Sequence, residues 1–521
     1  STFSIRRFAE VIMLNYMAVA AGEIFTPAVI GYIILGVLLG YIVGALPGMN
    51  RTTAIALAIP FTFTMPPAAA LSFLIGINKG GAAGAAVSAI LLNVPGEPSA
   101  VVTTYDGYPM TKQGRAQKAL VVALLASVTG DLLATVTLII LAQPIARFAI
   151  GLGPIELASI LIFSMTFIAA VSGESFFKAV IAGLLGLLLS APGIDMETGL
   201  PRMTFGMLEL YDGIPLLAVA IGTLALSEVL VQIDDGWRGN HQYPQMAEDK
   251  PKDPEPVFSL KDAARITPAV LRGSLVGTLV GILPGLGATL ASFLSYTWVR
   301  QSSKTPEIFG TGAPEGVAAS ESADNATVPA ALIPVFAIGV PGSLSTALLM
   351  GAFMMHGLTP GPFLFKESGS VVYAIYLGML LASAALLLVG LFGQRIFSMV
   401  IQVRKSVLLP IIVFLCIVGA YMEGGGMFGV YLMIVFGLVG YFMKKFDYSF
   451  VTFVVGYVLG PMAELTIRQS LIISDSNPAV LVDHPIAVIF LLLAAFSIWK
   501  FASAGTRSMQ AGQSAVTKSD A

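Results

Sequence analysis

The chain has 521 residues, of which 56% are hydrophobic and only 11% are charged. Soluble domains carry about 25% charged residues, so this composition indicates an all-α polytopic membrane protein. The apolar runs are far too long for the alternating strands of a membrane barrel. The net charge of −2 gives no indication of a nucleic-acid partner, and the single cysteine, Cys416, excludes an internal disulfide and a cysteine-rich metal site.

The chain divides into an N-terminal interfacial helix, a first half, a polar linker, a second half and a polar tail, at residues 1–27, 28–232, 233–265, 266–505 and 506–521. The first apolar run contains Glu10 and Asn15, which favours an interfacial helix over a cleavable signal peptide. A membrane-crossing helix needs about 20 residues, and several apolar runs are shorter or rich in glycine. We therefore expect about 12 transmembrane helices together with re-entrant or broken helices.

Two glycine-proline motifs each occur twice within apolar sequence. Gly-Ala-Leu-Pro-Gly at 44–48 returns as Gly-Ile-Leu-Pro-Gly at 281–285, and Asn-Val-Pro-Gly-Glu-Pro-Ser at 93–99 is matched by Gly-Val-Pro-Gly-Ser at 339–343. Proline removes a backbone donor and glycine weakens a helix. Broken helices survive in a bilayer only where they are buried or line a cavity. Paired breaks in two halves therefore predict a transporter substrate site, although one motif alone would indicate only a kink or tight packing.

The positive charges of the loops differ between the two halves. In the first half the connector between the motifs, 62–67, has no charge, whereas the loop after the second motif holds Lys112, Arg115 and Lys118. In the second half the connector holds Arg300 and Lys304, and the later loop holds only Lys366. Because positive loops stay cytoplasmic, we interpret the halves as two inverted-topology repeats.

Each Leu-Pro-Gly motif is expected to precede a half-helix whose free N–H groups and positive dipole end attract an anion. Arg51 would pair with a substrate carboxylate. The substrate-binding candidates after the two copies of this motif are Asn50, Arg51, Thr52, Gly287, Ala288 and Thr289. Carbonyl groups freed at the breaks would hold Na⁺, which makes Gly48 and Gly285 candidates for ion coupling.

The Val-Pro-Gly motifs supply the remaining substrate-binding candidates of the two loops: Asn93, Pro95, Gly96, Glu97, Ser99, Pro341, Gly342 and Ser343. Two further polar pairs, Asn78-Lys79 and Asp324-Asn325, stand 246 residues apart, the same offset as this motif. A charge at the bilayer centre costs about 2.5–3.5 kcal/mol, so each of these charges needs a partner, water or a loop.

Lys79 has three alternatives: it binds an anionic substrate, neutralises a nearby carboxylate, or extends to the membrane surface. We rank the carboxylate pair first and keep Lys79 as a substrate-binding candidate. For Asp324 and Asn325 the choice is cation coupling, by coordination or proton relay, or a polar loop within 311–325. The sequence does not separate these two readings.

No enzyme motif is present in the chain. The three histidines, His241, His356 and His484, form no His-Glu-x-x-His pattern, and neither a P-loop nor a Gly-x-Ser-x-Gly elbow occurs. An intramembrane hydrolase using Asp106 or Asp212 as acid is a further alternative, but no recognisable catalytic pair accompanies these residues. Asp106 is interpreted instead as a turn residue before Gly107. We therefore expect a protein that is not an enzyme and has no cofactor or resident metal.

At these motifs the chain resembles the large permease subunit of tripartite tricarboxylate transporters. The resemblance runs over about residues 28–505, and the segments that carry it are 44–48, 91–99, 102–110, 113–116, 281–287, 309–317, 338–343 and 356–362. It departs from the family pattern where Met49-Asn50-Arg51 follows the first Pro-Gly and where Asn78-Lys79 precede Gly80. These two extra cations would serve a different anion or replace a bound cation.

The resemblance implies uptake of small di- or tricarboxylates across the bacterial cytoplasmic (inner) membrane, driven by a Na⁺ or H⁺ gradient. It also implies two protein partners, a small membrane subunit and a periplasmic solute-binding protein, besides the carboxylate and membrane lipid. Alternating access, and within it an elevator-type movement, would fit such a transporter. The alternatives are an anion channel, which needs no ion coupling, and a transporter for a different anionic solute.

Overall fold

The computed structural model describes residues 16–46, 49–171, 175–195, 197–237, 258–400, 405–423, 426–475 and 477–501. Gly48, most of the predicted N-terminal helix, the middle of the predicted linker, His241 and the polar tail lie outside the described residues. The chain forms two compact units, and each takes sequence from both halves. Unit 1 comprises Ser1–Arg147 and Asp234–Leu415, and unit 2 comprises Phe148–Ile233 and Cys416–Ala521.

The regular elements of unit 1 are all helical within its described residues, and the first is a helix at 16–24. Its further elements in the first half are α2 (Pro27–Ala45), α3 (Arg51–Ala58), η1 (Ile59–Thr62), α4 (Pro67–Leu92), η2 (Pro98–Ala100), α5 (Val101–Lys112) and α6 (Ala116–Ile150), which ends in unit 2. In the second half they are α11 (Leu260–Ile282), α12 (Gly287–Gln301), η5 (Pro306–Ile308), α13 (Pro314–Ala330), α14 (Leu332–Ile338), α15 (Leu344–Met355), α16 (Leu364–Glu367), α17 (Gly369–Val400) and α18 (Lys405–Glu423), which also ends in unit 2.

Unit 2 contains the small hairpin of the chain. Its elements are α7 (Pro154–Val171), α8 (Phe176–Leu189), β1 (Gly193–Ile194), β2 (Pro201–Arg202), η3 (Leu208–Leu210), α9 (Leu216–Ala220), η4 (Ile221–Leu226, one π-helical segment), α10 (Ser227–Trp237), whose last residues belong to unit 1, α19 (Met427–Lys445), α20 (Phe450–Ile473), η6 (Pro478–Asp483) and a last helix at Pro485–Phe501. β1 and β2 pair antiparallel, with Gly193 opposite Arg202. Beside them, backbone hydrogen bonds, above all from Thr198, hold the pKa of Asp195 at about 2, so this carboxylate stays charged at physiological pH.

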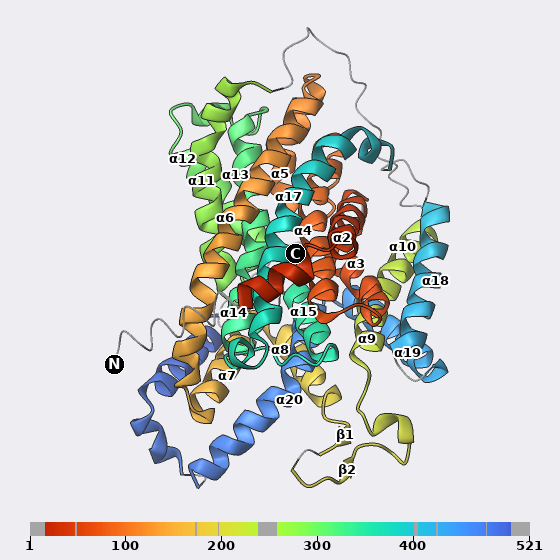
Figure 1. Cartoon of the computed structure of the whole chain (residues 1–521), viewed down its shortest axis with the longest axis vertical. Helices are drawn as coiled ribbons and strands as arrows, with labels where there is room; N and C mark the ends of the chain where they lie inside the picture. The colour runs from red at the N-terminus through yellow and green to blue at the C-terminus, as the bar shows by residue number, and fades with distance from the viewer. Residues whose placement is uncertain are drawn as a thin grey trace, which may run out of the picture. The chain divides into compact units, whose positions relative to one another are not determined.

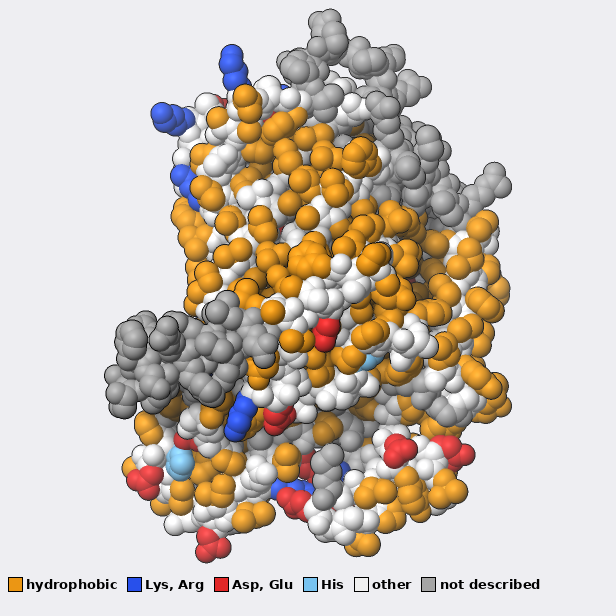
Figure 2. All heavy atoms as spheres, viewed as in Figure 1, with side chains coloured by type: hydrophobic (Ala, Val, Ile, Leu, Met, Phe, Trp, Pro, Cys, Tyr) orange, Lys and Arg blue, Asp and Glu red, His pale blue; other side chains and the backbone are white. Residues whose placement is uncertain are grey.

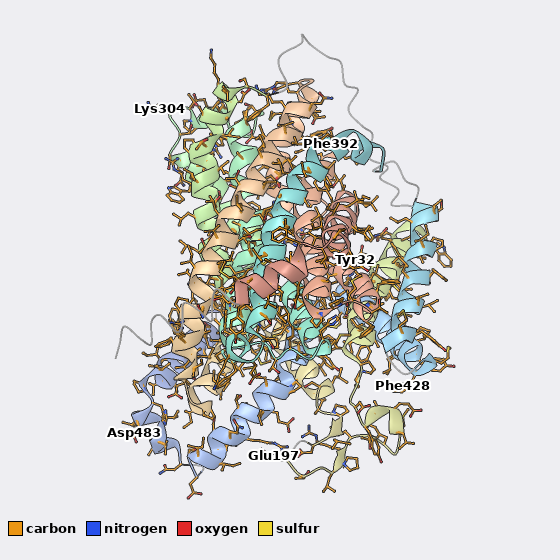
Figure 3. The ribbon with its side chains drawn as sticks, in the orientation of Figure 1. Tyr32, Glu197, Lys304, Phe392, Phe428 and Asp483 are labelled. Carbon is orange, nitrogen blue, oxygen red and sulfur yellow. The ribbon has the colours of Figure 1, made fainter. Side chains whose placement is uncertain are left out.

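Eight helices within the described residues are long and apolar enough to cross a membrane. They correspond to α2, α4, α6, α7, the stretch from α9 to α10, α17 up to Gly393, α19 and α20, and four shorter apolar helices accompany them. Figure 2 shows a face covered mainly by hydrophobic side chains, as expected of a surface that faces lipid. Of the charged residues labelled in Figure 3, Lys304 lies just beyond α12, Glu197 lies between β1 and β2, and Asp483 is the last residue of η6. The polytopic helical fold is confirmed, while the exact number of spans stays a prediction.

Glycines bring the main helix pairs of unit 1 into backbone contact. α2 packs on α4 (Figure 1), and a Cβ atom added at Gly36, Gly40 or Gly44 of α2 would collide with a backbone carbonyl of α4. In the second half α11 packs on α13, and Gly277 there meets the Ala323 carbonyl in the same way. Small residues four apart let helix backbones approach closely in membranes. The helix before each break is thus held against α4 in the first half and against α13 in the second, where α14 lies between α13 and the Val-Pro-Gly loop.

Replacing Gly40 by valine is expected to lower the thermal unfolding temperature, because the carbonyl of Ile77 that its Cβ would meet belongs to a buried helix backbone. Overpacking of a core typically costs about 1–3 kcal/mol. Gly31 lies on the same helix with no atom near its Cβ position, so Gly31→Val is the matched control. Equal unfolding temperatures for the two variants in detergent would contradict the backbone contact.

Both Leu-Pro-Gly motifs coincide with helix breaks. α2 ends at Ala45 and α3 begins at Arg51, while α11 ends at Ile282 and α12 begins at Gly287. The Val-Pro-Gly motifs also match, because Asn93 after α4 and Gly339 after α14 both adopt the left-handed conformation that ends a helix. The order of helix, break and loop thus recurs in both halves. The inverted orientation of the repeats stays a prediction.

Two polar segments differ from the expectation of loops and turns. Asp324 and Asn325 lie on helix α13, which begins at Pro314 and is buried over nearly its whole length, so the alternative of a loop tip is wrong. Asp106 is a fully buried residue of α5 and not a turn residue. In both cases buried polar partners, described below, stabilise side chains that would be costly alone in an apolar environment.

Candidate functional site

The two motifs of each half contact each other. In the second half the Gly285 N–H donates to the Gly342 carbonyl at 3.0 Å. In the first half the backbone of Gly96 packs on the Gly44 carbonyl so closely that a Cβ at Gly96 would lie 2.5 Å from that oxygen. Glycine at these positions therefore lets each Val-Pro-Gly loop pack closely against the Leu-Pro-Gly motif of the same half. The irregular backbone of both halves is only partly buried within unit 1, and Asn93, Pro98 and Leu283 are exposed.

Arg51 is the first residue of α3. Asn50 caps this helix, because its side-chain oxygen accepts from the Thr53 N–H at 2.8 Å and from the Thr52 hydroxyl at 2.5 Å. Gly81 of α4 leaves room for the arginine, since a Cβ there would lie 2.5 Å from the Arg51 Cβ. The Asn50 cap and the space beside Gly81 together fix the position of the Arg51 backbone and Cβ.

Carboxylates from both halves surround Arg51. Its backbone N–H donates to Glu97 Oε1 at 2.8 Å, and its Nε lies 3.1 Å from Glu97 Oε2. Its Nη2 lies 3.5 Å from Asp324 Oδ1, while the Ser99 hydroxyl donates to Asp324 Oδ2 at 2.8 Å. The Nη1 atom of Arg51 is buried and has no hydrogen-bond partner. Both N–H donors of Nη1 are therefore left for a ligand.

A second carboxylate of α13 extends this cluster. Glu321 lies one turn before Asp324 and accepts from the Thr103 hydroxyl at 2.5 Å and from the Ser127 hydroxyl at 3.1 Å. The Asn325 amide donates to the Ser127 hydroxyl at 2.8 Å, and its own Oδ1 is buried without a partner. Glu97, Glu321 and Asp324 are all at least 93% buried around a single arginine. The cluster holds more acidic than basic groups, an imbalance that favours a proton or a bound cation.

A small cavity of about 30 Å³ adjoins Arg51. It is lined by Arg51, Gly281, Gly287, Ala288, Thr327, Val328, Ala331, Gly342, Ser343 and Ser345. A single water needs about 10–15 Å³ on this measure, so the cavity has room for about two waters and is smaller than a carboxylate substrate. Helix α12 starts at its wall with no side-chain cap, which leaves the first N–H groups of that helix for a ligand. Gly287 adopts φ +70° there, a conformation that favours glycine.

The structure thus places the predicted site residues in three groups. Arg51, Gly287, Ala288, Gly342 and Ser343 line the cavity. Glu97, Ser99, Asp324 and Asn325 belong to the adjoining acidic cluster, with Asn50 and Thr52 at the helix cap and Gly285 bonded to the neighbouring loop. Lys79, Asn93, Pro95, Gly96, Thr289 and Pro341 do not line the cavity, and their roles as substrate ligands stay predictions.

The sequence showed that Glu321 needs a partner, but no site role was predicted for Glu321, Thr327 or Ser345. Glu321, Asp324 and Thr327 are spaced by three residues, which places them on one face of a helix. That spacing would have predicted a polar helix face, but the segment 311–325 is polar enough to be interpreted as a loop. Within the described residues no group of three or more His, Cys, Asp or Glu side chains is arranged to hold a metal ion.

The sequence model of the family described as "Tripartite tricarboxylate transporter TctA family" matches residues 30–455. The chain belongs to this family. It is 35% identical over 483 residues to an uncharacterized 52.8 kDa protein of the TAR-I ttuC' 3' region of Agrobacterium vitis, which covers 92% of this chain and 94% of that relative. A second relative, from the TAR-II ttuC' 3' region of the same organism, is 36% identical over 215 residues, 41% of this chain and 89% of its own. No solved structure matches the chain.

Membership of the TctA family, together with the apolar helices, makes this chain a multi-pass protein of the bacterial inner membrane. The family is one of transporters, not of enzymes. The resemblance that was drawn from the glycine-proline motifs is therefore confirmed.

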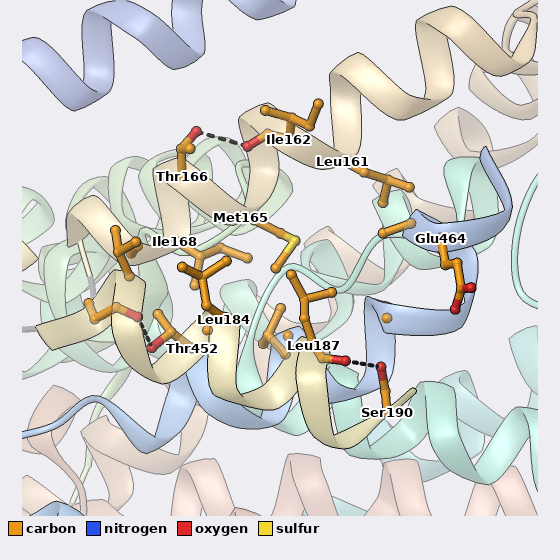
Figure 4. Close-up of a pocket in the computed structure, with 18 of the residues that line it drawn as sticks. Leu161, Ile162, Met165, Thr166, Ile168, Leu184, Leu187, Ser190, Thr452 and Glu464 are labelled. Carbon is orange, nitrogen blue, oxygen red and sulfur yellow. Dashed lines mark hydrogen bonds between the residues drawn. The ribbon is translucent and has the colours of Figure 1, made fainter. Parts of the chain in front are cut away.

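A larger cavity of about 400 Å³ lies within unit 2, between α7, α8 and α20 (Figure 4). Apolar side chains such as Leu161, Met165 and Leu187 form most of its wall, and Glu464 is the one charged residue that lines it. Glu464 is itself paired with Arg202, at 2.9 Å between Oε2 and Nη2. Among the described residues no cationic side chain lines this cavity, and its apolar wall offers a carboxylate few hydrogen-bond donors. The small cavity at Arg51 is therefore the candidate substrate site of this TctA-family chain.

Proposed function

We propose that this chain is the large membrane subunit of a secondary transporter that takes up small di- or tricarboxylates, coupled to a Na⁺ or H⁺ gradient. It would act with a small membrane subunit and with a periplasmic binding protein that delivers the substrate. Membership of the TctA family supports the tripartite assembly. The observation that carries the proposal is the pairing of an anion-attracting cavity with an excess of buried carboxylates.

The cavity has the chemistry to bind a carboxylate. The unpaired Nη1 of Arg51 and the uncapped start of α12 both favour a negative charge. Ser343 and Ser345 add hydroxyl groups at the cavity wall. The substrate would enter after the helices around the cavity separate, because its present volume admits only water.

The acidic cluster gives a physical reason for coupling. Glu97, Glu321 and Asp324 would repel an incoming carboxylate and compete with it for Arg51. A cation or proton at Asp324 and Asn325 would neutralise this charge and release the arginine for the substrate. Binding of the cation would thus raise the affinity for the anion, and by linkage the anion would raise the affinity for the cation. Alternating access, of the elevator type, would then carry both across the membrane.

The proposal is tested by uptake of radiolabelled di- and tricarboxylates into proteoliposomes that contain the chain, its small membrane subunit and the binding protein. Accumulation against the substrate gradient, driven by an inward Na⁺ or H⁺ gradient and lost without the binding protein, is expected. The two ion gradients are applied separately to identify the coupling ion. Equilibration without any gradient would instead identify an anion channel.

Replacing Asp324 by asparagine is expected to uncouple the two ligands, because the neutral amide no longer repels the substrate or attracts a cation. A coupling free energy of about 1–3 kcal/mol corresponds to about 5–150-fold in affinity, and we expect this cation dependence of substrate binding to disappear. Glu307→Gln removes one acidic charge from the exposed segment η5 and is the matched control. Unchanged cation dependence in Asp324→Asn would place the coupling site elsewhere.

A further inference from the structure

Lys79 of α4 lies in a separate polar cluster of unit 1. Four oxygen atoms surround its ammonium nitrogen: Asp131 Oδ2 at 2.9 Å, Thr135 Oγ1 at 3.0 Å, Ser383 Oγ at 2.9 Å and the Met379 carbonyl at 2.8 Å. The expected pairing of Lys79 with a carboxylate is confirmed. None of these residues lines the cavity at Arg51.

The oxygens come from two helices at regular positions. Asp131 and Thr135 are four residues apart on α6, and Met379 and Ser383 are four residues apart on α17, so each pair faces Lys79 from one side of its helix. The Lys79 side chain is 0% exposed and the Asp131 side chain 1%. Bulk solvent therefore does not contact this pair, and the surrounding side chains and carbonyl supply its hydrogen bonds.

The number of oxygens exceeds the number of protons that the ammonium can donate. A lysine ammonium has three N–H donors, yet four oxygens lie within 3.0 Å of the nitrogen. The Ser383 hydroxyl donates to Asp131 Oδ2 at 2.6 Å, which turns its lone pairs toward Lys79. The other carboxylate oxygen, Asp131 Oδ1, is buried without a hydrogen-bond partner. A carboxylate, two hydroxyls and a carbonyl around one point form the coordination shell of a spherical cation, for which hard oxygen ligands are typical.

We infer that Asp131, Thr135, Ser383 and the Met379 carbonyl form a site for a monovalent cation, which Lys79 fills with its own ammonium group. The lysine is a permanently tethered occupant, so the site is charged and complete at any salt concentration. Shortening the side chain of Lys79 would leave an oxygen-lined cavity with an unpaired buried carboxylate. An alkali-metal ion would then bind there and replace the missing charge.

The test measures the thermal unfolding of the purified full chain in detergent, in NaCl, KCl or choline chloride of equal ionic strength. The response of the wild type to Na⁺ and K⁺ is the baseline, because a cation bound at the acidic cluster around Arg51 would raise its unfolding temperature as well. Lys79→Ala is expected to unfold at a much lower temperature in choline chloride. Its unfolding temperature should rise with the concentration of Na⁺ or K⁺ and saturate, as for a ligand that binds only the folded protein.

Two further variants make the result specific. Lys79→Ser is measured in parallel, because its hydroxyl adds an oxygen to the emptied cavity. It serves as the second test variant if Lys79→Ala does not fold. Lys79→Ala/Asp131→Asn removes the carboxylate and should lose the response to Na⁺ and K⁺. An equal response in this double variant, or in the wild type, would place the ion elsewhere and overturn the inference.

The inference is also overturned if the two single variants unfold alike in all three salts, or fold in none of them. Either result would make Lys79 a member of an ordinary buried ion pair that no free cation replaces. The measurement follows unfolding and not transport, so its outcome is independent of the proposed carboxylate uptake.

Discussion

Replacing Arg51 by alanine is expected to abolish carboxylate uptake and to destabilise the protein by about 3–5 kcal/mol, the usual cost of breaking a buried ion pair from one side. The side chains of Glu97 and Asp324 are only 6% and 2% exposed, so the variant leaves their charges buried without a cation. The measurements are uptake into proteoliposomes and the unfolding temperature in detergent. Uptake at the rate of the wild type would remove Arg51 from the substrate site.

Two companion variants separate the charge of Arg51 from its shape. Arg51→Lys keeps a positive charge but loses the planar fork that contacts Glu97 and Asp324 together, so we expect a folded protein with strongly reduced uptake. Arg300 lies exposed in the last turn of α12 and provides the control. Arg300→Ala should leave the uptake rate and the unfolding temperature close to those of the wild type. Full uptake by Arg51→Lys would reduce the role of the arginine to its charge.

Replacing Asp106 by alanine is expected to cost at least about 3 kcal/mol in stability, since about 1–3 kcal/mol is lost for each buried donor left unpaired. Asp106 Oδ1 accepts from the N–H groups of Gly310, Gly312 and Ala313 at 2.8, 2.9 and 2.8 Å. Its Oδ2 accepts from the Tyr296 hydroxyl at 2.9 Å. The carboxylate thus holds the segment that leads into α13.

Because α13 carries Glu321 and Asp324, Asp106→Ala should also reduce uptake by displacing the acidic cluster. Asp106→Asn is the matched control, as its amide oxygen still accepts from backbone N–H groups and should preserve more of the stability. The unfolding temperature in detergent and uptake are measured for both variants. An Asp106→Ala protein as stable as the wild type would show that the segment at 310–313 is held by other contacts.

The parts of the fold that follow from local chemistry were predictable from the sequence. The apolar composition predicted membrane helices, and the Leu-Pro-Gly motifs marked both breaks because Pro and Gly act on their own backbone. The helix within the segment 311–325 was not predictable, because the polarity of this segment is typical of loops. Its buried partners, Thr103 and Ser127, lie about 200 residues away in the sequence. Local sequence carries no signal of such distant contacts.

The partners of Lys79 were likewise not predictable from local sequence. Its need for a carboxylate followed from the cost of a buried charge, but Asp131 and Ser383 lie 52 and 304 residues further along the chain. The glycines of α2 and α11 were visible in the sequence, yet their four-residue spacing was not used to predict which helices pack together. Arg51 was predictable because it directly follows the first break.

The backbone contacts between α2 and α4 and between α11 and α13 also restrict how this chain can change under selection for a new substrate. Where a glycine contacts a backbone carbonyl, neither helix has a side chain whose size could be changed. Single substitutions therefore cannot alter the distance between these helices in small steps. Adaptation is then expected at residues that present a side chain to the cavity, such as Val328 and Ser345. Divergent members of the family should therefore vary at the cavity wall while the distance between these helices stays the same.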